Sequence, residues 1–285
     1  AYGRLEKVLT PSPFRVEPVC AFHRQCGGCQ IQAMSYERQL RFKQSRIRNN
    51  LIRIGGFSQE LVDRVSEPIV GMEEPFHYRN KAQYPVGVDK NGKPVAGFYA
   101  GRTHSIIANT DCALGAPENQ EILEMILNWM EENHVPAYRE DTGEGLIRHA
   151  LIRRGFRSGQ IMVCLVINQR ADGRKAGEYL PGQRGLIDAL AGIPGMTSIS
   201  VCFNPRRTNV IMGQETALLW GKETIEDIIR VRDVEKNFEE IGREISFDIS
   251  PLSFYQVNPE QMEKLYSLAL DYAALKGDET VWDLY

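Results

Sequence analysis

The sequence lacks long apolar runs, a strong excess of either charge and a glycine-rich nucleotide-binding fingerprint. No window approaches the roughly 18 consecutive apolar residues of a membrane span, and the opening AYGRLEKVLT has no apolar signal core. With 34 Lys and Arg against 37 Asp and Glu, the net charge is -3, so any nucleic-acid surface must be local. These absences predict a cytoplasmic protein that does not enter a membrane.

What is present is an ordinary globular composition. The 285 residues are 42% hydrophobic and 25% charged, which excludes a disordered chain and a disulfide-dense miniprotein. This length allows one large or two ordinary domains. Alternating apolar residues predict an α/β protein whose central domain is α+β with an antiparallel sheet.

The pattern places the secondary-structure elements as follows. Hairpins are expected over residues 76–107, turning at 89–92, and around Arg157-Ser158, with further strands at 197–204, 209–213, 217–220 and 245–250. Helices are expected at residues 36–54 behind a Ser35 cap, after Pro117, at 186–190, and after an Asn258 cap followed by Pro259. Residues 279–285, ETVWDLY, read as the first strand of a nucleotide-binding α/β unit.

Six cysteines fall into two groups. Cys20, Cys26 and Cys29 form C-x5-C-x2-C, a spacing that favours a metal site over disulfides, and Cys112 in a predicted loop is the best fourth ligand. From spacing alone, structural zinc, an iron–sulfur cluster and unliganded thiols all remain open, and with zinc His23 could replace Cys112. The other two cysteines, at 164 and 202, lie in apolar runs and are expected to be small buried hydrophobes.

The predicted helix at residues 36–54 is strongly basic. Between residues 36 and 53 it carries six basic residues and a single acid, Glu37. A phosphate-facing stripe and a solvated helix face are both compatible with this pattern.

Several motifs, taken in order, resemble one family. They are CAFHRQCGGCQIQ with YERQLRFK, YRNKAQYPV, GFYAGRTHSII with the following DC, IRHALIRRG, NPRRTNVIMG and SFYQVNPEQMEKLY…ETVWDLY. Together they resemble the RNA uracil-5-methyltransferases that use S-adenosylmethionine, specifically the ribosomal RNA branch with an iron–sulfur cluster. The resemblance covers nearly the whole chain and implies a central domain followed by the beginning of a Rossmann-like methyltransferase fold.

The resemblance also implies roles for individual residues. Cys20, Cys26, Cys29 and Cys112 would hold a [4Fe–4S] cluster, Gln256 would touch the methyl donor, and Tyr285 would line the donor pocket. Phe254 and Asn258 are neighbours of that site. In the family the nucleophilic cysteine and the general base lie beyond the position of Tyr285, so no catalytic residue is assigned and we expect no methyl transfer by this chain alone.

The resemblance further implies a domain organisation and a partner. Residues 1–19 would be a remnant of an N-terminal TRAM-like β-barrel, 20–31 and 64–252 the iron–sulfur domain, and 32–63 and 253–285 parts of the methyltransferase domain. The expected partner is 23S ribosomal RNA, bound by a monomer. Candidates for RNA contact are Arg38, Arg41, Arg46, His77, Arg79, Lys81, Arg206 and Arg207.

Two other functions are compatible with parts of the sequence. A stand-alone RNA-binding module stabilised by a bound metal would need only the cysteines and the basic surface. An iron–sulfur electron-transfer protein is disfavoured because GxGxxG and other flavin or nicotinamide fingerprints are absent. A transfer RNA substrate is also disfavoured, because the family branch that acts on it lacks this cysteine set.

Overall fold

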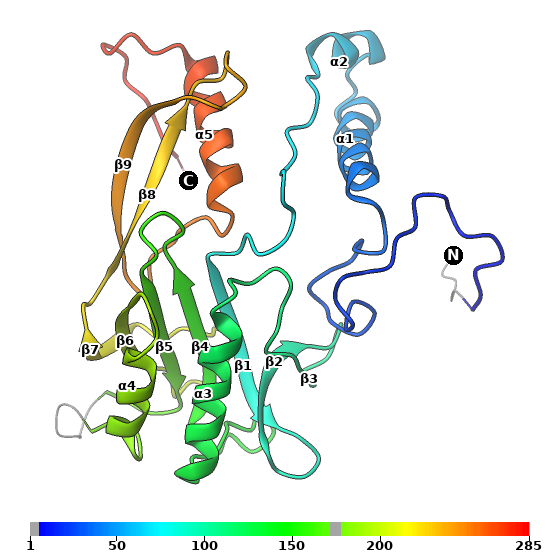
Figure 1. Cartoon of the computed structure of the whole chain (residues 1–285). Coiled ribbons are helices and arrows are strands. Elements are labelled where there is room, and N and C mark those ends of the chain that lie inside the picture. Colours follow the sequence, from blue (N-terminus) through cyan, green and yellow to red (C-terminus); the bar gives the residue numbers. More distant parts are fainter. Residues whose placement is uncertain (1–5, 172–177, 285) are drawn as a thin grey trace.

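A computed structural model describes residues 6–171 and 178–284. Its centre is a seven-stranded sheet in the order β3-β2-β1-β4-β5-β6-β7 (Figure 1). Neighbouring strands are antiparallel except β5 and β6, which are parallel. The strands are β1 (Lys81–Val88), β2 (Pro94–Tyr99), β3 (Ile106–Ala108), β4 (Ile147–Arg154), β5 (Ile161–Ile167), β6 (Met196–Phe203) and β7 (Glu215–Gly221). The predicted mixed α/β architecture with a largely antiparallel sheet is confirmed.

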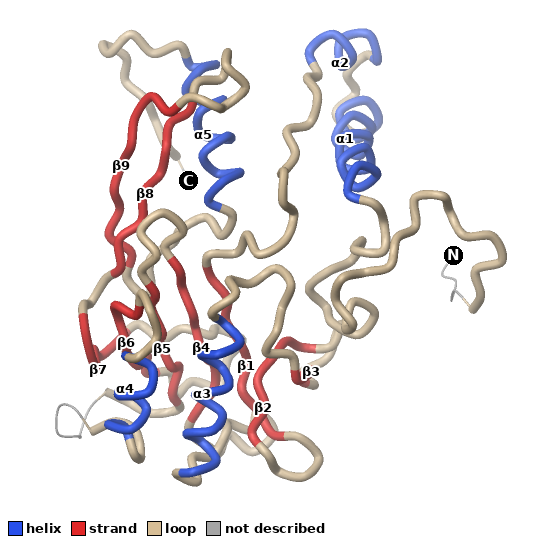
Figure 2. Tube along the Cα trace, viewed as in Figure 1, coloured by secondary structure: helices blue, strands red, loops and turns tan. Residues whose placement is uncertain are grey.

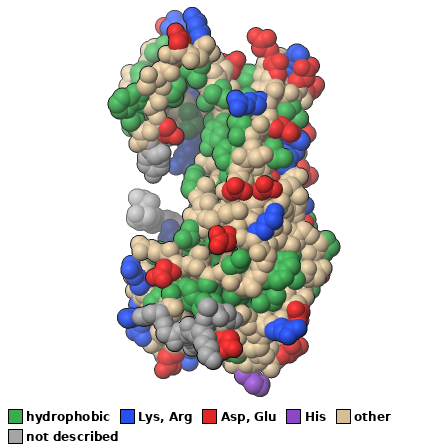
Figure 3. Space-filling model, turned by 90° about the vertical axis from the view of Figure 1, so that its left-hand side faces the viewer, with side chains coloured by type: hydrophobic (Ala, Val, Ile, Leu, Met, Phe, Trp, Pro, Cys, Tyr) green, Lys and Arg blue, Asp and Glu red, His purple; other side chains and the backbone are tan. Residues whose placement is uncertain are grey.

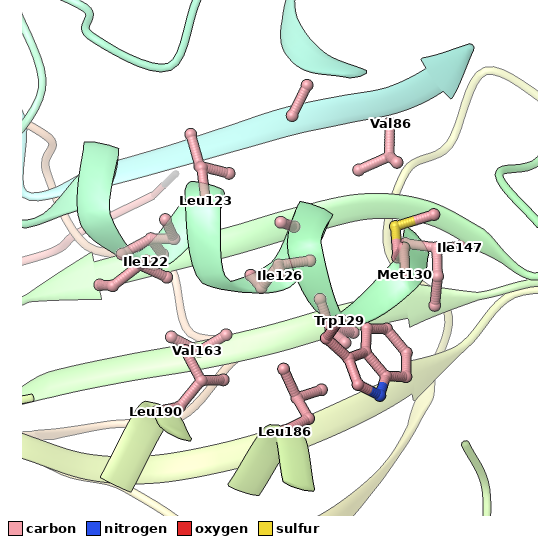
Figure 4. Packing of buried hydrophobic residues seen from close by; sticks show 14 of the residues in the cluster. Val86, Ile122, Leu123, Ile126, Trp129, Met130, Ile147, Val163, Leu186 and Leu190 are labelled. Carbon is pink, nitrogen blue, oxygen red and sulfur yellow. The ribbon is translucent and has the colours of Figure 1, made fainter. Parts of the chain in front are cut away.

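Two helices cover one face of this sheet and form the main core with it. Helix α3 (Asn119–Glu132) and helix α4 (Gln183–Ala191) lie side by side over the strands (Figures 1 and 4). In α3 the helical spacing of Ile122, Ile126 and Trp129 turns all three into the core, and Trp129 Nε1 donates to the Pro181 carbonyl at 3.0 Å. Burying each such side chain contributes about 1.5–3 kcal/mol to folding.

The opposite face of the sheet is more polar. Leu151, Cys164, Val166 and Cys202 form a small buried cluster there, covered by Ile211 and Met212. Buried polar side chains share this face because the strands alternate side chains about the sheet; they are His149, Arg153, Ser198 and Ser200.

A second, smaller unit consists of a hairpin and a helix. Strand β8 (Ile225–Arg232) pairs antiparallel with β9 (Ile241–Ile249), and helix α5 (Pro259–Ala273) packs against β8. Inside this unit Glu263, which is 1% exposed, bonds Arg232 at 2.7 Å and Arg157 of the β4–β5 hairpin at 3.1 Å. Figure 3 shows the side of the molecule that carries β7 and β9, where hydrophobic side chains lie among charged ones.

Helices α1 (Tyr36–Arg53) and α2 (Gln59–Val65) form an arm beside the rest of the molecule, reached through long loops (Figures 1 and 2). Helix α1 matches its predicted span, but Ser35 makes no side-chain cap bond. None of its residues is buried; Ile47 of its apolar face is 63% exposed, and Ile54 directly after it is 82% exposed. An ion pair of 2.5 Å between Arg48 and Asp63 joins the two helices.

Two predicted strands do not form. Residues 209–213 lie in the β6–β7 loop, because the Asn204 side chain donates to the carbonyls of Val210 and Ile211 and holds them in a turn. Residues 279–284 are irregular, and Trp282 is 77% exposed, because no strand pairs with this segment in the described part of the chain. No helix among the described residues is long and apolar enough to cross a membrane.

Candidate functional site

The cysteine segment folds onto the end of strand β2. Gly27 N donates to the Tyr99 carbonyl at 3.1 Å, and Gly101 N donates to the Gln25 carbonyl at 3.0 Å. A side chain at Gly27 would begin 3.4 Å from the Gly101 Cα, so the two backbones meet closely. At the neighbouring glycine, the N–H of Gly28 lies 3.4 Å from Cys26 Sγ, as expected for a loop that turns backbone donors toward sulfur.

Cys112 approaches the same segment from the loop after β3. Burial raises the pKa of the Cys29 thiol, and charge on Cys112, Cys26 and Cys20 raises it further. Burial is also the main cause that raises the pKa of Cys112, which Cys20 and Cys26 augment. All four thiols are free and partly buried. The four cysteines predicted as ligands are therefore within electrostatic reach of one another.

The four cysteines can be compared with the ligands that zinc and an iron–sulfur cluster require. Zinc needs its ligands to converge within about 2.3 Å of one point. Among the described residues no group of three or more His, Cys, Asp or Glu side chains is placed to hold a metal ion. His23, the alternative zinc ligand, turns its Nδ1 to the Cys20 carbonyl at 3.3 Å. Four cysteine thiolates are a ligand set of both structural zinc and iron–sulfur clusters, so the donor chemistry fits either group.

The segment 250–258, which contains Gln256, is fixed by two buried side chains, one in β4 and one directly before β1. Arg153 at the end of β4 is 3% exposed and donates through Nη2 to the carbonyls of Ser253 and, at 3.3 Å, of Pro251. Asn80, also 3% exposed, donates through Nδ2 to the Gln256 carbonyl at 2.8 Å. These bonds define the path of the backbone on which Gln256 sits.

Side chains alternate along the segment 250–258. Tyr255 points inward, and its hydroxyl donates to Asp227 Oδ2 at 3.3 Å; burial and the neighbouring Asp227 raise the pKa of Tyr255. Asp227, which is fully buried, also accepts the backbone N–H groups of Phe156 and Arg157 at 3.1 and 2.9 Å. Phe254, by contrast, is 84% exposed. Phe254 is therefore exposed to solvent, while its neighbour Tyr255 is held in the interior by Asp227.

The start of α5 connects this segment with the cysteines. Asn258 caps α5 as predicted, since its side chain accepts from Gln261 N at 3.1 Å. Gln261 Nε2 donates to the Gly71 carbonyl at 2.8 Å, which ties the loop after α2 to the same helix end. A cavity of about 620 Å³ lies between these elements, and its walls include Cys29, Tyr36, Tyr78, Asn258 and Gln261. Tyr285 lies outside the described residues.

The structure distributes the eight predicted RNA-contact residues over three regions. Arg79 and Lys81 lie beside the cysteines and Arg153: a charge on Arg79 lowers the pKa of Cys29, while burial and then Arg153 lower the pKa of Lys81. His77 belongs to this region too, with Nδ1 3.0 Å from the Gly115 carbonyl.

On α1, Arg38 lies over the Phe14 ring at 5.0 Å, Arg41 pairs with Glu37 at 2.6 Å, and Arg46 is exposed. The third region, with Arg206 and Arg207, is the β6–β7 loop at the other end of the sheet.

The remaining two cysteines are buried, as predicted. Burial raises the pKa of Cys164 to about 12, and burial also raises the pKa of Cys202. Such thiols stay protonated near neutral pH and are poor nucleophiles.

Sequence reasoning missed Asn80, Arg153, Asp227 and Glu263. For Arg153 there was a signal, because a charged residue inside the apolar run IRHALIRRG must find a buried partner.

Comparison with known proteins finds RNA methyltransferases among the relatives of this chain. No family model matches. The chain is 42% identical over all of its length to an uncharacterized RNA methyltransferase of Clostridium tetani and 41% identical to one of Halalkalibacterium halodurans. Its homologues are RNA methyltransferases. The chain spans 56% and 57% of the length of these two relatives.

A solved structure shares the fold. It is the tRNA (uracil-54, C5)-methyltransferase of Pyrococcus abyssi in complex with S-adenosyl-L-homocysteine, with a TM-score of 0.62 and 24% identity. The match covers 93% of this chain and 53% of that protein. The likeness therefore supports the mixed α/β architecture described above.

Proposed function

We propose that this chain is the cysteine-bearing portion of an S-adenosylmethionine-dependent RNA (uracil-C5)-methyltransferase that modifies 23S ribosomal RNA in the cytoplasm. The observation that carries the proposal is the 42% identity to an RNA methyltransferase along the entire chain. The electrostatic proximity of the four cysteines supports the ribosomal RNA branch, to which the sequence motifs point.

Cys20, Cys26, Cys29 and Cys112 are the residues that would hold a [4Fe–4S] cluster. Methyl transfer needs no electron transfer, so the cluster would supply structure: it would tie the segment before α1 to the loop after β3. Arg79, whose charge lowers the pKa of Cys29, offsets part of the negative charge of a thiolate site.

Gln256 is proposed to contact the methyl donor near the target uracil. S-adenosylmethionine, when bound, supplies the methyl group. The chain's own contribution is to hold the backbone of the segment 250–258, at Gln256 through Asn80 and at Pro251 and Ser253 through Arg153, before the substrate arrives. The target base must leave its stack to reach such a site, and RNA loops allow this at low cost.

We also propose that the 285 residues alone do not transfer methyl groups. Uracil C5 becomes nucleophilic only after a thiolate adds to C6. The two cysteines outside the metal site are buried, and burial raises the pKa of each. Neither can supply this thiolate near neutral pH.

The function is tested by nucleoside mass spectrometry of RNA from cells with and without the gene. We expect 23S ribosomal RNA to lose one or more 5-methyluridines in the disrupted strain, and a plasmid copy to restore them. If ribosomal RNA keeps its 5-methyluridine and transfer RNA loses it, the ribosomal RNA assignment is wrong and the transfer RNA branch takes its place. Unchanged 5-methyluridine in both RNAs would overturn it.

A further inference from the structure

The β6–β7 loop, residues 204–214, encloses a pocket that lies far from the cysteines and from Gln256. The pocket has a volume of about 740 Å³. Its lining combines two arginines with apolar side chains and one carboxylate; these are Arg170, Arg206, Phe203, Val210, Met212 and Glu215. We propose that it binds a nucleotide of single-stranded RNA, with the base against the apolar wall and the phosphate facing Arg170 and Arg206.

The pocket is built before any ligand arrives. Arg148, 5% exposed, donates through Nη1 to the carbonyls of Asn204 and Arg206, each at 2.7 Å, and its guanidinium lies 4.5 Å from the centre of the Tyr138 ring. The Asn204 side chain donates to the carbonyls of Val210 and Ile211 at 2.7 and 2.9 Å. A loop closed by buried side chains loses little entropy when a ligand binds.

The far end of the loop is fixed as tightly. Gly213 N donates to Cys202 Sγ at 3.1 Å, and a Cβ at Gly213 would stand 1.8 Å from the Phe203 carbonyl oxygen, so the chain can pass there only as glycine. Arg207 is turned outward and donates to the Thr142 carbonyl. Arg206 and Arg170 are left exposed at the pocket.

The chemistry of the lining selects a nucleotide over a simple anion. Phosphate oxygens pair with guanidinium groups, whereas the apolar wall of Phe203, Val210 and Met212 offers nothing to an inorganic ion. A nucleobase has an apolar face that can lie on such a wall, and only an unpaired base exposes it. The choice of RNA as the source of the nucleotide rests on the proposed function.

The pocket and the segment that carries Gln256 lie at opposite ends of β4. Strand β4 runs from Arg148, which supports the pocket loop, to Arg153, which holds the segment of Gln256. Five residues of strand at about 3.3 Å each separate the two supports by about 17 Å. RNA bound at both places would span the sheet, so the pocket would select and orient RNA without touching the reacting base.

The test uses a fluorescein-labelled, single-stranded oligoribonucleotide of about 12 nucleotides, which suits the site sizes of such grooves. The double variant Arg170→Ala and Arg206→Ala should bind the RNA at least tenfold more weakly. The slope of log affinity against log salt concentration should fall by the equivalent of about one to two phosphate contacts. Arg184→Ala is the matched control: it removes a positive charge from the exposed side of α4 and should change affinity less than twofold. Unchanged thermal midpoints establish that all variants are folded.

A second readout locates the RNA directly. With 4-thiouridine in the oligonucleotide, ultraviolet crosslinks should map to the peptide containing residues 203–215. RNA binding that the double variant weakens no more than Arg184→Ala, with crosslinks only elsewhere, overturns the pocket and leaves the proposed function standing. Equal affinity for a duplex of the same sequence overturns the single-stranded assignment. No RNA binding by the wild-type chain overturns the pocket, whereas the proposed function is tested separately by the 5-methyluridine analysis.

Discussion

At the scale of single residues, His149 couples stability to pH. Burial, with a smaller contribution from Arg148, lowers the pKa of His149 to about 4 from an ordinary value of 6.5. A proton therefore binds the unfolded chain more readily than the folded one. The stability due to the neutral imidazole is complete above pH 6.5 and is lost as the pH falls toward 4, by about 3 kcal/mol.

Urea unfolding between pH 7 and 4 measures this contribution. The wild-type free energy of unfolding should fall more steeply with acid than that of His149→Gln. His134→Gln, which changes an exposed histidine, serves as the control and should follow the wild type. Parallel curves for wild type and His149→Gln would show that His149 is not buried in its neutral form.

Asp227 joins three parts of the chain at one carboxylate. It accepts from the backbone of the β4–β5 hairpin and from the Tyr255 hydroxyl. Asp227→Ala leaves the buried Tyr255 hydroxyl and two half-buried backbone N–H groups without this acceptor, so we expect a loss of about 3 kcal/mol or more in the free energy of unfolding. Asp188→Ala, at an exposed position on α4, should cost about 0.5 kcal/mol or less. Equal losses for the two variants would contradict the role assigned to Asp227.

At the scale of elements, β4 acts as a support for the segment 250–258. Arg153→Met keeps an unbranched side chain but removes the donors to the carbonyls of Pro251 and Ser253. Amide hydrogen exchange in residues 250–258 should then become about tenfold faster, as expected for the loss of a charged hydrogen bond.

Arg154→Met is the matched control for this experiment. Arg154 follows Arg153 in β4 but pairs with Glu118 at 2.9 Å, away from the segment. Exchange in residues 250–258 should be unchanged in this variant. If both variants accelerate exchange there equally, the effect belongs to the whole strand and not to the Arg153 side chain.

Sequence patterns predicted the elements that local rules determine. Helix α1, the turn at Asp89 and the Asn258 cap all follow from short-range spacing and turn chemistry. The strands predicted at 209–213 and 279–285 failed for a different reason. A strand needs a partner, and an apolar run does not reveal whether one exists or whether a distant residue such as Asn204 captures its carbonyls instead.

For the same reason, the sequence indicated the cysteines of the candidate site but not the residues that hold the Gln256 segment. Cysteine spacing pointed to the segment with Cys20, Cys26 and Cys29, and the structure brings Cys112 within electrostatic reach of it. That these four residues hold a metal group stays a prediction. The supports of Gln256 could not be found this way, because Asn80 and Arg153 are distant from it in sequence and act through backbone carbonyls. Only tertiary structure shows which carbonyl a buried donor meets.

At the scale of the whole molecule, the cysteines join the start of the chain to the large sheet, and a metal group bound there would fix that junction. Visible absorption together with iron and zinc analysis of anaerobically purified protein tests this directly. We predict a broad band at about 400 nm and about four irons per chain.

Two substitutions make the result specific to the site. Cys112→Ser should lose the band and the iron, whereas Cys202→Ala, which alters a buried cysteine of the sheet, should keep both. One zinc per chain without colour, or iron that survives Cys112→Ser, would contradict the assignment of a [4Fe–4S] cluster to Cys20, Cys26, Cys29 and Cys112.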